Sequence, residues 1–241
     1  MKRRQFLGTL SSAAATSAFL NSASTQAEPA STALVTTPLV LMAPTRDGFD
    51  AVWGVGRLSK GRILCVGDDG AKLEFGTDSF GFVPQGEKFL RVRVRGLRPG
   101  TKYQISAVTT AANDGEQHTS ESKPFATLDE KAASTEFVVW NDTHIHNDTI
   151  QDLHAATPSA DFLIWNGDTC NNWTSPDLLI PTLLNPGARD ITQRRPLFIT
   201  WGNHDVRGPH AFEMPELVAT PNNRPFYAFR SGPVALICLH T

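Results

Sequence analysis

The sequence has 241 residues, enough for about two domains of ordinary size, and its 40% hydrophobic content is sufficient for packed cores. Lys and Arg total 22 against 24 Asp and Glu, a formal net charge of −2, with no basic run after the first four residues, so binding of nucleic acid through a charged stripe is not expected. The 3 cysteines stand at unrelated spacings, which fits neither a disulfide framework nor a cysteine-rich zinc site.

Residues 1–27 are predicted to be an export signal. A basic start is followed over residues 6–20 by a mildly apolar run rich in Ala, Ser and Thr, which is too short and too polar to span a bilayer. The pair Arg3 and Arg4 resembles a twin-arginine signal, with an ordinary secretory signal as the alternative, and cleavage is expected after Ala27. We therefore expect the twin-arginine export machinery as a partner, no stable membrane anchor, and a periplasmic or secreted product.

Residues 32–128 are predicted to form an all-β sandwich. No helical period of comparable strength competes with the short strand-like runs, which are residues 34–35, 38–42, 49–55, 62–66, 89–94 and 103–108. The segment from Gly96 to Tyr103 resembles the corner of fibronectin type III-like domains, in which the tyrosine hydroxyl bonds back to the backbone. No ligand-spaced cluster of His, Asp or Cys occurs here. The interpretation is a scaffold, with an adhesive or carbohydrate-binding role left open.

From residue 135 to residue 241 the pattern changes to an α/β domain. Strand-like runs now alternate with candidate helices near residues 149–156 and 176–184. The connections are long enough for right-handed crossovers between parallel strands, which we expect at residues 136–141, 161–165 and 196–201.

Each of these three strands ends in a polar cluster, at residues 141–144, 166–168 and 202–205. The carboxyl ends of parallel strands form one edge of a sheet, where ligands bind. Any one cluster could be only a turn. Three of them in this order predict a functional site at that edge.

The residue types suit a two-metal hydrolytic centre, whose ions lie roughly 3.5 to 4 Å apart and need a bridging ligand. Asp168 is the natural bridge, Asp142 and His144 would hold one ion, and Asn203 would hold the other through its side-chain oxygen. Oxygen and imidazole ligands without thiolate suit Mn, Fe or Zn. Water shared by the two ions would become a hydroxide that attacks phosphorus in line with the leaving oxygen.

Three residues near the third cluster are assigned to the reaction itself. His204 would protonate or polarise the leaving group, and Asp205 would fix the tautomer of His204 and raise its basicity. Arg207 is the candidate contact to the substrate phosphate, because it stands close to His204 and a guanidinium matches phosphate geometry.

These clusters resemble the first three motifs of the calcineurin-like metallophosphoesterases, and with a fibronectin-like N-terminal domain the layout is similar to purple acid phosphatases and their bacterial relatives. The resemblance implies a two-sheet α/β fold and phosphoester hydrolysis, with metal at Asp142, His144, Asp168 and Asn203 and catalysis at His204. Asn171 stands where many relatives carry an acid, and is a candidate for a supporting role beside the substrate. No tyrosine follows the bridging residue, so an iron-tyrosinate centre is not expected.

The resembled family completes its site with later histidines, including a Gly-His-x-His motif, and this sequence ends inside a strand-like run at residues 235–241. We expect an N-terminal fragment that holds about half of the catalytic domain. The favoured hypothesis is an exported phosphomonoesterase acting on a small phosphorylated substrate with two metal ions. The alternatives are a phosphodiesterase and a non-catalytic secreted metal- or ligand-binding protein with a degenerate domain.

Overall fold

The computed structural model describes residues 33–78 and 80–240, and these fall in one compact unit. The export signal predicted at residues 1–27 lies outside the described residues. Among the described helices, none has the length and apolar character that a membrane crossing requires.

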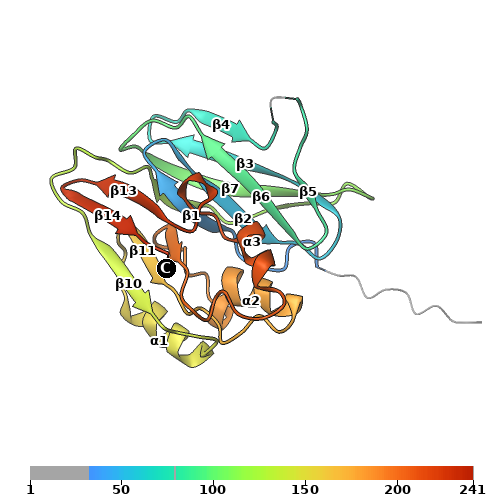
Figure 1. The fold of residues 1–241 in the computed structure, drawn as a ribbon. Helices are drawn as coiled ribbons and strands as arrows, with labels where there is room; N and C mark the ends of the chain where they lie inside the picture. Colours follow the sequence, from blue (N-terminus) through green and yellow to red (C-terminus); the bar gives the residue numbers. More distant parts are fainter. Residues whose placement is uncertain (1–32, 79, 241) are drawn as a thin grey trace, which may run out of the picture. The chain divides into compact units, whose positions relative to one another are not determined.

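One mixed sheet of six strands runs through both predicted domains, in the order β10-β11-β12-β1-β2-β6 (Figure 1). The strands are β1 (Val40–Thr45), β2 (Gly48–Gly54), β6 (Phe89–Arg95), β10 (Phe137–Asn141), β11 (Phe162–Asn166) and β12 (Leu197–Thr200). The strands β10, β11 and β12 are parallel, as the sequence predicts. The strand β1 joins β12 in parallel at Met42 and Leu197, and β2 and β6 follow antiparallel.

A second, antiparallel sheet has the order β4-β3-β7-β8, with β5 paired to β3 and β9 paired to β7. Its strands are β3 (Ser59–Gly67), β4 (Lys72–Phe75), β5 (Gln85–Gly86), β7 (Lys102–Ala111), β8 (Gln117–Thr119) and β9 (Lys123–Ala126). The strands β4, β5, β8 and β9 were not predicted, because runs of 2 to 4 residues are too short to show a clear apolar pattern. The predicted corner contact is present: the Tyr103 hydroxyl accepts the Arg98 backbone N–H at 3.0 Å.

The strands β1 and β2 are buried on both faces. Leu41 and Ala51 belong to the core between the two sheets, whereas Met42 and Val52 belong to the core beneath the helices. A strand covered on both sides has no solvent-facing positions, so its sequence is continuously apolar and does not alternate. This explains the mainly apolar sequences of both strands, with Asp50 the charged exception on β2, and it joins the sandwich core to the helical core through one layer.

The helices cover one face of β10, β11 and β12, and a hairpin covers part of the other (Figure 1). The helices are α1 (Asn147–Ala156), α2 (Leu179–Leu184) and α3 (Met214–Leu217), with short 3-10 turns at Pro176–Leu178, Pro186–Ala188, Ala211–Glu213 and Pro221–Asn223. The hairpin of β13 (Tyr227–Ser231) and β14 (Val234–Cys238) packs on Phe162 and Phe198. Both predicted helices are therefore confirmed to within a few residues.

A buried carboxylate connects the sandwich to the helical side. Asp50 on β2 is 1% exposed and accepts hydrogen bonds from Arg91 at 2.9 and 3.0 Å and from Arg95 at 2.9 Å. Arg91 also donates to the backbone carbonyl of Pro215 in α3 at 3.2 Å. Asp50 therefore neutralises arginines that would otherwise repel one another, and orients one of them toward α3.

We expect Asp50→Ala to lower the free energy of unfolding by about 3 kcal/mol, because it leaves the partly buried Arg91 and Arg95 without their carboxylate. Urea unfolding followed by circular dichroism measures this. Glu87→Ala is the control, because Glu87 is exposed, and it should change stability by less than about 0.5 kcal/mol. Equal stability of the two variants would contradict this assignment.

The three cysteines, Cys65, Cys170 and Cys238, are free and buried. Burial raises the pKa of Cys65 and of Cys170 to about 12, and it also raises the pKa of Cys238. Since the thiolate is the reactive species, all three thiols should react with iodoacetamide at pH 8 far more slowly in the native protein than in urea. Mass spectrometry of alkylated protein counts the modified thiols. A cysteine that reacts as fast in the native protein as in urea would contradict the buried position of that thiol.

Candidate functional site

The three predicted clusters meet at one edge of the sheet. Asn141, Asn166 and Thr200 are in register at the carboxyl ends of β10, β11 and β12, and the clusters follow directly. Asp142, His144 and Asp168 have positive φ values of 55°, 46° and 49°. A positive φ is unusual outside glycine and occurs where the surrounding structure enforces it, often at functional sites. The backbone there is shaped to aim these side chains.

His144, Asp168 and His204 form a group whose ligand atoms all lie within 4.8 Å of one another. The two imidazole rings are nearly perpendicular, with centroids 4.9 Å apart. Asp142 lies beside this group, because its Oδ1 is 2.9 Å from Nε2 of His144. The edge therefore brings together two imidazoles and two carboxylates.

Each imidazole is oriented by a backbone carbonyl of the loop that follows Asp168. His144 Nδ1 lies 3.0 Å from the carbonyl oxygen of Cys170, and His204 Nδ1 lies 2.7 Å from that of Asn171. Because a carbonyl only accepts, Nδ1 carries the proton in both rings and Nε2 is left for a metal ion or a transferred proton. Two successive peptide groups thus set the tautomers of both histidines.

Asp205 is fully buried and acts on this loop rather than on the ring of His204. Its carboxylate accepts the N–H groups of Asp168 at 2.7 Å, Thr169 at 2.9 Å and Gly202 at 2.8 Å, and the Thr169 hydroxyl at 2.5 Å. Burial raises the pKa of Asp205, and these hydrogen bonds oppose the shift. The expected contact between Asp205 and the His204 ring is replaced by the Asn171 carbonyl, because a desolvated carboxylate is better satisfied by several donors.

Asp168 and Asn203 are held by their neighbours at the same edge. Oδ1 of Asp168 accepts the backbone N–H of His204 at 2.9 Å. With the amide orientation that satisfies both of its neighbours, Asn203 donates to Oδ2 of Asp168 at 3.2 Å and accepts from Arg207 at 2.6 Å. A Cβ atom at Gly202 would collide with the Asp168 carboxylate, so this position requires glycine.

Two features of the site were missed by sequence analysis. Trp173 is fully buried, and its ring N–H donates to the carbonyl of Asp205 at 2.9 Å while its backbone N–H donates to that of Arg207 at 3.0 Å. Thr169 supplies two of the four donors to Asp205. Nothing in the sequence pattern marks either contact, because both depend on loops that meet only in the folded chain. Asn171 contributes its backbone carbonyl to the site.

The residues present fit a centre of hard or borderline metal ions. The donors are carboxylate oxygens, an amide oxygen and imidazole nitrogens, and the nearby thiol of Cys170 is buried and protonated. Nε2 of His144 lies 2.9 Å from Oδ1 of Asp142. If this nitrogen carries no proton, both atoms are acceptors, and they require a proton or a cation between them. Two of the expected metal ligands, His144 and Asp168, belong to the group described above, which also contains His204, the residue assigned from the sequence to catalysis.

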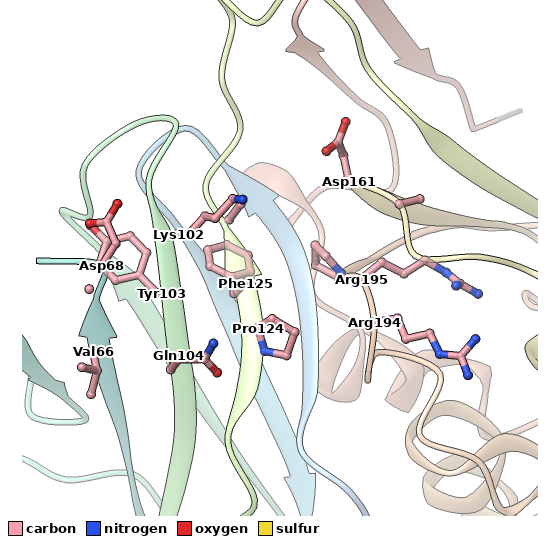
Figure 2. Close-up of a pocket in the computed structure, with 14 residues that line it drawn as sticks. Val66, Asp68, Lys102, Tyr103, Gln104, Pro124, Phe125, Asp161, Arg194 and Arg195 are labelled. Carbon is pink, nitrogen blue, oxygen red and sulfur yellow. The ribbon is translucent and has the colours of Figure 1, made fainter. Parts of the chain in front are cut away.

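A separate cavity of about 350 Å³ lies at the opposite, amino ends of β11 and β12, between those ends and the β3, β7 and β9 strands (Figure 2). Its lining includes Tyr103 and Phe125 from the sandwich and Arg194 and Arg195 from the segment before β12. Figure 2 shows both arginine side chains extending away from Tyr103, and Arg195 donates to the Thr157 hydroxyl at 2.6 Å. This cavity contains none of the predicted site residues.

Comparison with known proteins supports the fold. Residues 135–240 match the calcineurin-like phosphoesterase family. A solved structure of purple acid phosphatase PPD1 from yellow lupin (Lupinus luteus) seeds is similar, with a TM-score of 0.61, 12% identity, and coverage of 86% of this chain and 44% of the lupin chain. A structure of PhoD is similar with a TM-score of 0.52, 13% identity, and coverage of 88% and 52%.

The chain therefore spans about half the length of these two proteins, with 44% and 52% of their chains covered. No curated protein matches the sequence significantly. The mixed sheet, the order of the three clusters and the family match agree with one another. Residues 135–240 are therefore similar to calcineurin-like phosphoesterase domains.

Proposed function

We propose that this protein is a metal-dependent phosphoesterase, with phosphomonoesters as its preferred substrates. One observation carries the proposal: two imidazoles, each held through Nδ1 by a backbone carbonyl, and two carboxylates converge at the carboxyl edge of the parallel strands. Hydrolysis of a phosphoester needs groups that neutralise charge on phosphorus and a group that protonates the leaving oxygen. This edge offers both.

Each residue has a definite task in the proposal. Asp168 would be shared by two metal ions, one also held by Asp142 and His144 and the other also held by Asn203. When bound there, two ions of Mn, Fe or Zn would supply Lewis-acid activation of the phosphoryl group and of the attacking water. His204, with both ring nitrogens protonated, would give the Nε2 proton to the leaving oxygen, while its Nδ1–H stays on the Asn171 carbonyl at 2.7 Å.

The remaining proposals concern the setting of the site. The exposed guanidinium of Arg207 contacts a phosphate oxygen, since it lies 3.4 Å from both ring nitrogens of His204. The net charge of −2 favours a small phosphorylated substrate over nucleic acid. We propose export of the protein through residues 1–27 by the twin-arginine machinery. We also propose that the sandwich is fibronectin type III-like and serves as a support for the catalytic edge.

The first test measures hydrolysis of an aryl phosphate by the Mn²⁺-loaded protein. Chelation should abolish the activity, and His204→Ala should lower kcat by about 10²- to 10⁴-fold, because the leaving group loses its proton donor. His118→Ala is the control, since His118 lies on the exposed strand β8 and should leave the rate unchanged.

Calorimetry with Mn²⁺ separates the possible failures of this test. A His204→Ala variant that still binds Mn²⁺ but is slow supports the proton-donor role. A protein that binds Mn²⁺ and hydrolyses neither an aryl phosphate nor an aryl phosphodiester would overturn the enzyme proposal in favour of a metal-binding protein. Faster hydrolysis of the diester would replace the monoesterase assignment with a phosphodiesterase.

We expect Asp205→Asn to weaken Mn²⁺ binding by at least about 10-fold and to lower the free energy of unfolding by about 2 to 3 kcal/mol. An asparagine turns an NH₂ group toward backbone donors that the carboxylate accepts, which leaves buried donors unpaired. Calorimetry and urea unfolding measure the two effects. Asp152→Asn, on the exposed face of α1, is the matched control. Unchanged metal affinity in Asp205→Asn would contradict the role of Asp205 as an organiser of the loop.

A further inference from the structure

The guanidinium of Arg207 contacts two side chains that are assigned to the reaction, the amide of Asn203 and the ring of His204. Its Nη2 donates to the Asn203 amide oxygen at 2.6 Å, and its Nη1 lies 3.4 Å from each ring nitrogen of His204. Asn203 in turn donates to Oδ2 of Asp168 at 3.2 Å. The guanidinium is therefore bonded directly to the Asn203 amide and, through it, to the Asp168 carboxylate. These are the two groups assigned to one metal position.

This position of the guanidinium is incompatible with a metal ion at Asn203. The amide oxygen is the only atom of that side chain that can coordinate a metal, and here it accepts a short, charge-assisted hydrogen bond. A divalent cation on the same oxygen would stand within a few ångströms of the positive guanidinium, where like charges repel strongly. The amide nitrogen that now faces Asp168 would also have to leave. Metal and Arg207 thus compete for Asn203.

The backbone of Arg207 is held by hydrogen bonds, whereas its side chain is exposed to solvent. Its N–H donates to the His204 carbonyl at 3.0 Å, and its carbonyl accepts from the Trp173 N–H at 3.0 Å. Gly208 follows with a φ of 95° and packs so closely on Trp173 that a Cβ atom would collide with the tryptophan backbone. The side chain, by contrast, is exposed. Because solvent surrounds the guanidinium, the side chain has room for a second position on the same backbone.

We propose that Arg207 is a metal-displaced arm, by which we mean a side chain that leaves Asn203 when a metal ion binds there and then binds the phosphoryl group. In the structure its guanidinium contacts Asn203 and His204. The Asn203 oxygen would instead hold the metal ion, and the Arg207 guanidinium, released from Asn203, would bind the non-bridging oxygens of a phosphate monoester, which its planar fork matches. The inference rests on the proposed function and adds an order of events to it: the phosphate contact forms only after the metal position is filled. By thermodynamic reciprocity, phosphate then tightens metal binding to the same degree.

The test uses calorimetry with Mn²⁺ and with inorganic phosphate as probes, on the whole protein and on Arg207→Met. We expect Arg207→Met to bind Mn²⁺ about 5-fold more tightly, because the competing cation is gone. The unaltered protein should bind phosphate at least about 10-fold more tightly with Mn²⁺ than without it, and Arg207→Met should lose most of this gain. Arg230→Met, which removes an exposed arginine from β13, is the matched control and should behave like the unaltered protein.

The outcomes separate the arm from the proposed function. If Arg207→Met binds Mn²⁺ and phosphate as the unaltered protein does, the arm is overturned and the metal centre stands. If Arg207→Met binds Mn²⁺ more weakly, Arg207 supports the metal position and does not compete for it, which also overturns the arm. If neither protein binds Mn²⁺, the metal centre falls and the arm falls with it. Arg207→Lys, which keeps the charge without the planar fork, should recover only part of the phosphate affinity.

Discussion

The candidate site depends on one buried charge. The Asp205 carboxylate has no solvent around it and takes four hydrogen bonds from Asp168, Thr169 and Gly202. An unpaired carboxylate at such a place would be very costly, so these donors must stay close to it in the folded chain. The loop after β11 and the loop after β12 are therefore held together. With that contact in place, the carbonyls of Cys170 and Asn171 reach the two histidines.

The same loops rest on a sheet that is stiffened from both sides. The strand β1 joins the edge of β12, and its two faces enter two different cores. A buried ion pair adds to this connection, because Lys123 on β9 bonds to Asp190 at 2.6 Å and to Thr192 at 3.1 Å. Burial lowers the pKa of Lys123, and Asp190 opposes that shift. The sandwich thereby supports the segment that leads into β12, and β12 carries the third cluster.

The charges at the edge explain why a cation is expected there. Asp142 and Asp168 bring two carboxylates beside two imidazoles whose Nδ1 atoms are already paired with carbonyls. Arg207 supplies positive charge at this edge in the structure described here, through Asn203 and the His204 ring. Metal ions would supply the same compensation with more directional bonds. Competition between the two kinds of cation follows from a shared set of acceptors.

The amino-acid sequence by itself determined the local structure and the positions of the chemistry. The apolar runs before Asp142, Asp168 and Gly202 predicted three parallel strands, and the polar residues that follow them predicted the site edge, because strand direction alone brings those ends together. The helices near residues 149–156 and 176–184 were also predictable from their patterns. These features depend on interactions between residues that are near in sequence or on general rules of sheet topology.

Only the tertiary structure decided how the residues of the edge divide their tasks. Asp205 stands next to His204 in the sequence, yet its carboxylate turns to the backbone of residues 168 and 169, and the His204 ring is oriented by Asn171. In the same way, the pairing of β1 with β12 joins segments more than 150 residues apart. The physical reason is common to both. A buried charge and an open strand edge are satisfied by whichever partners the folded chain brings near, and sequence separation carries no information about that choice.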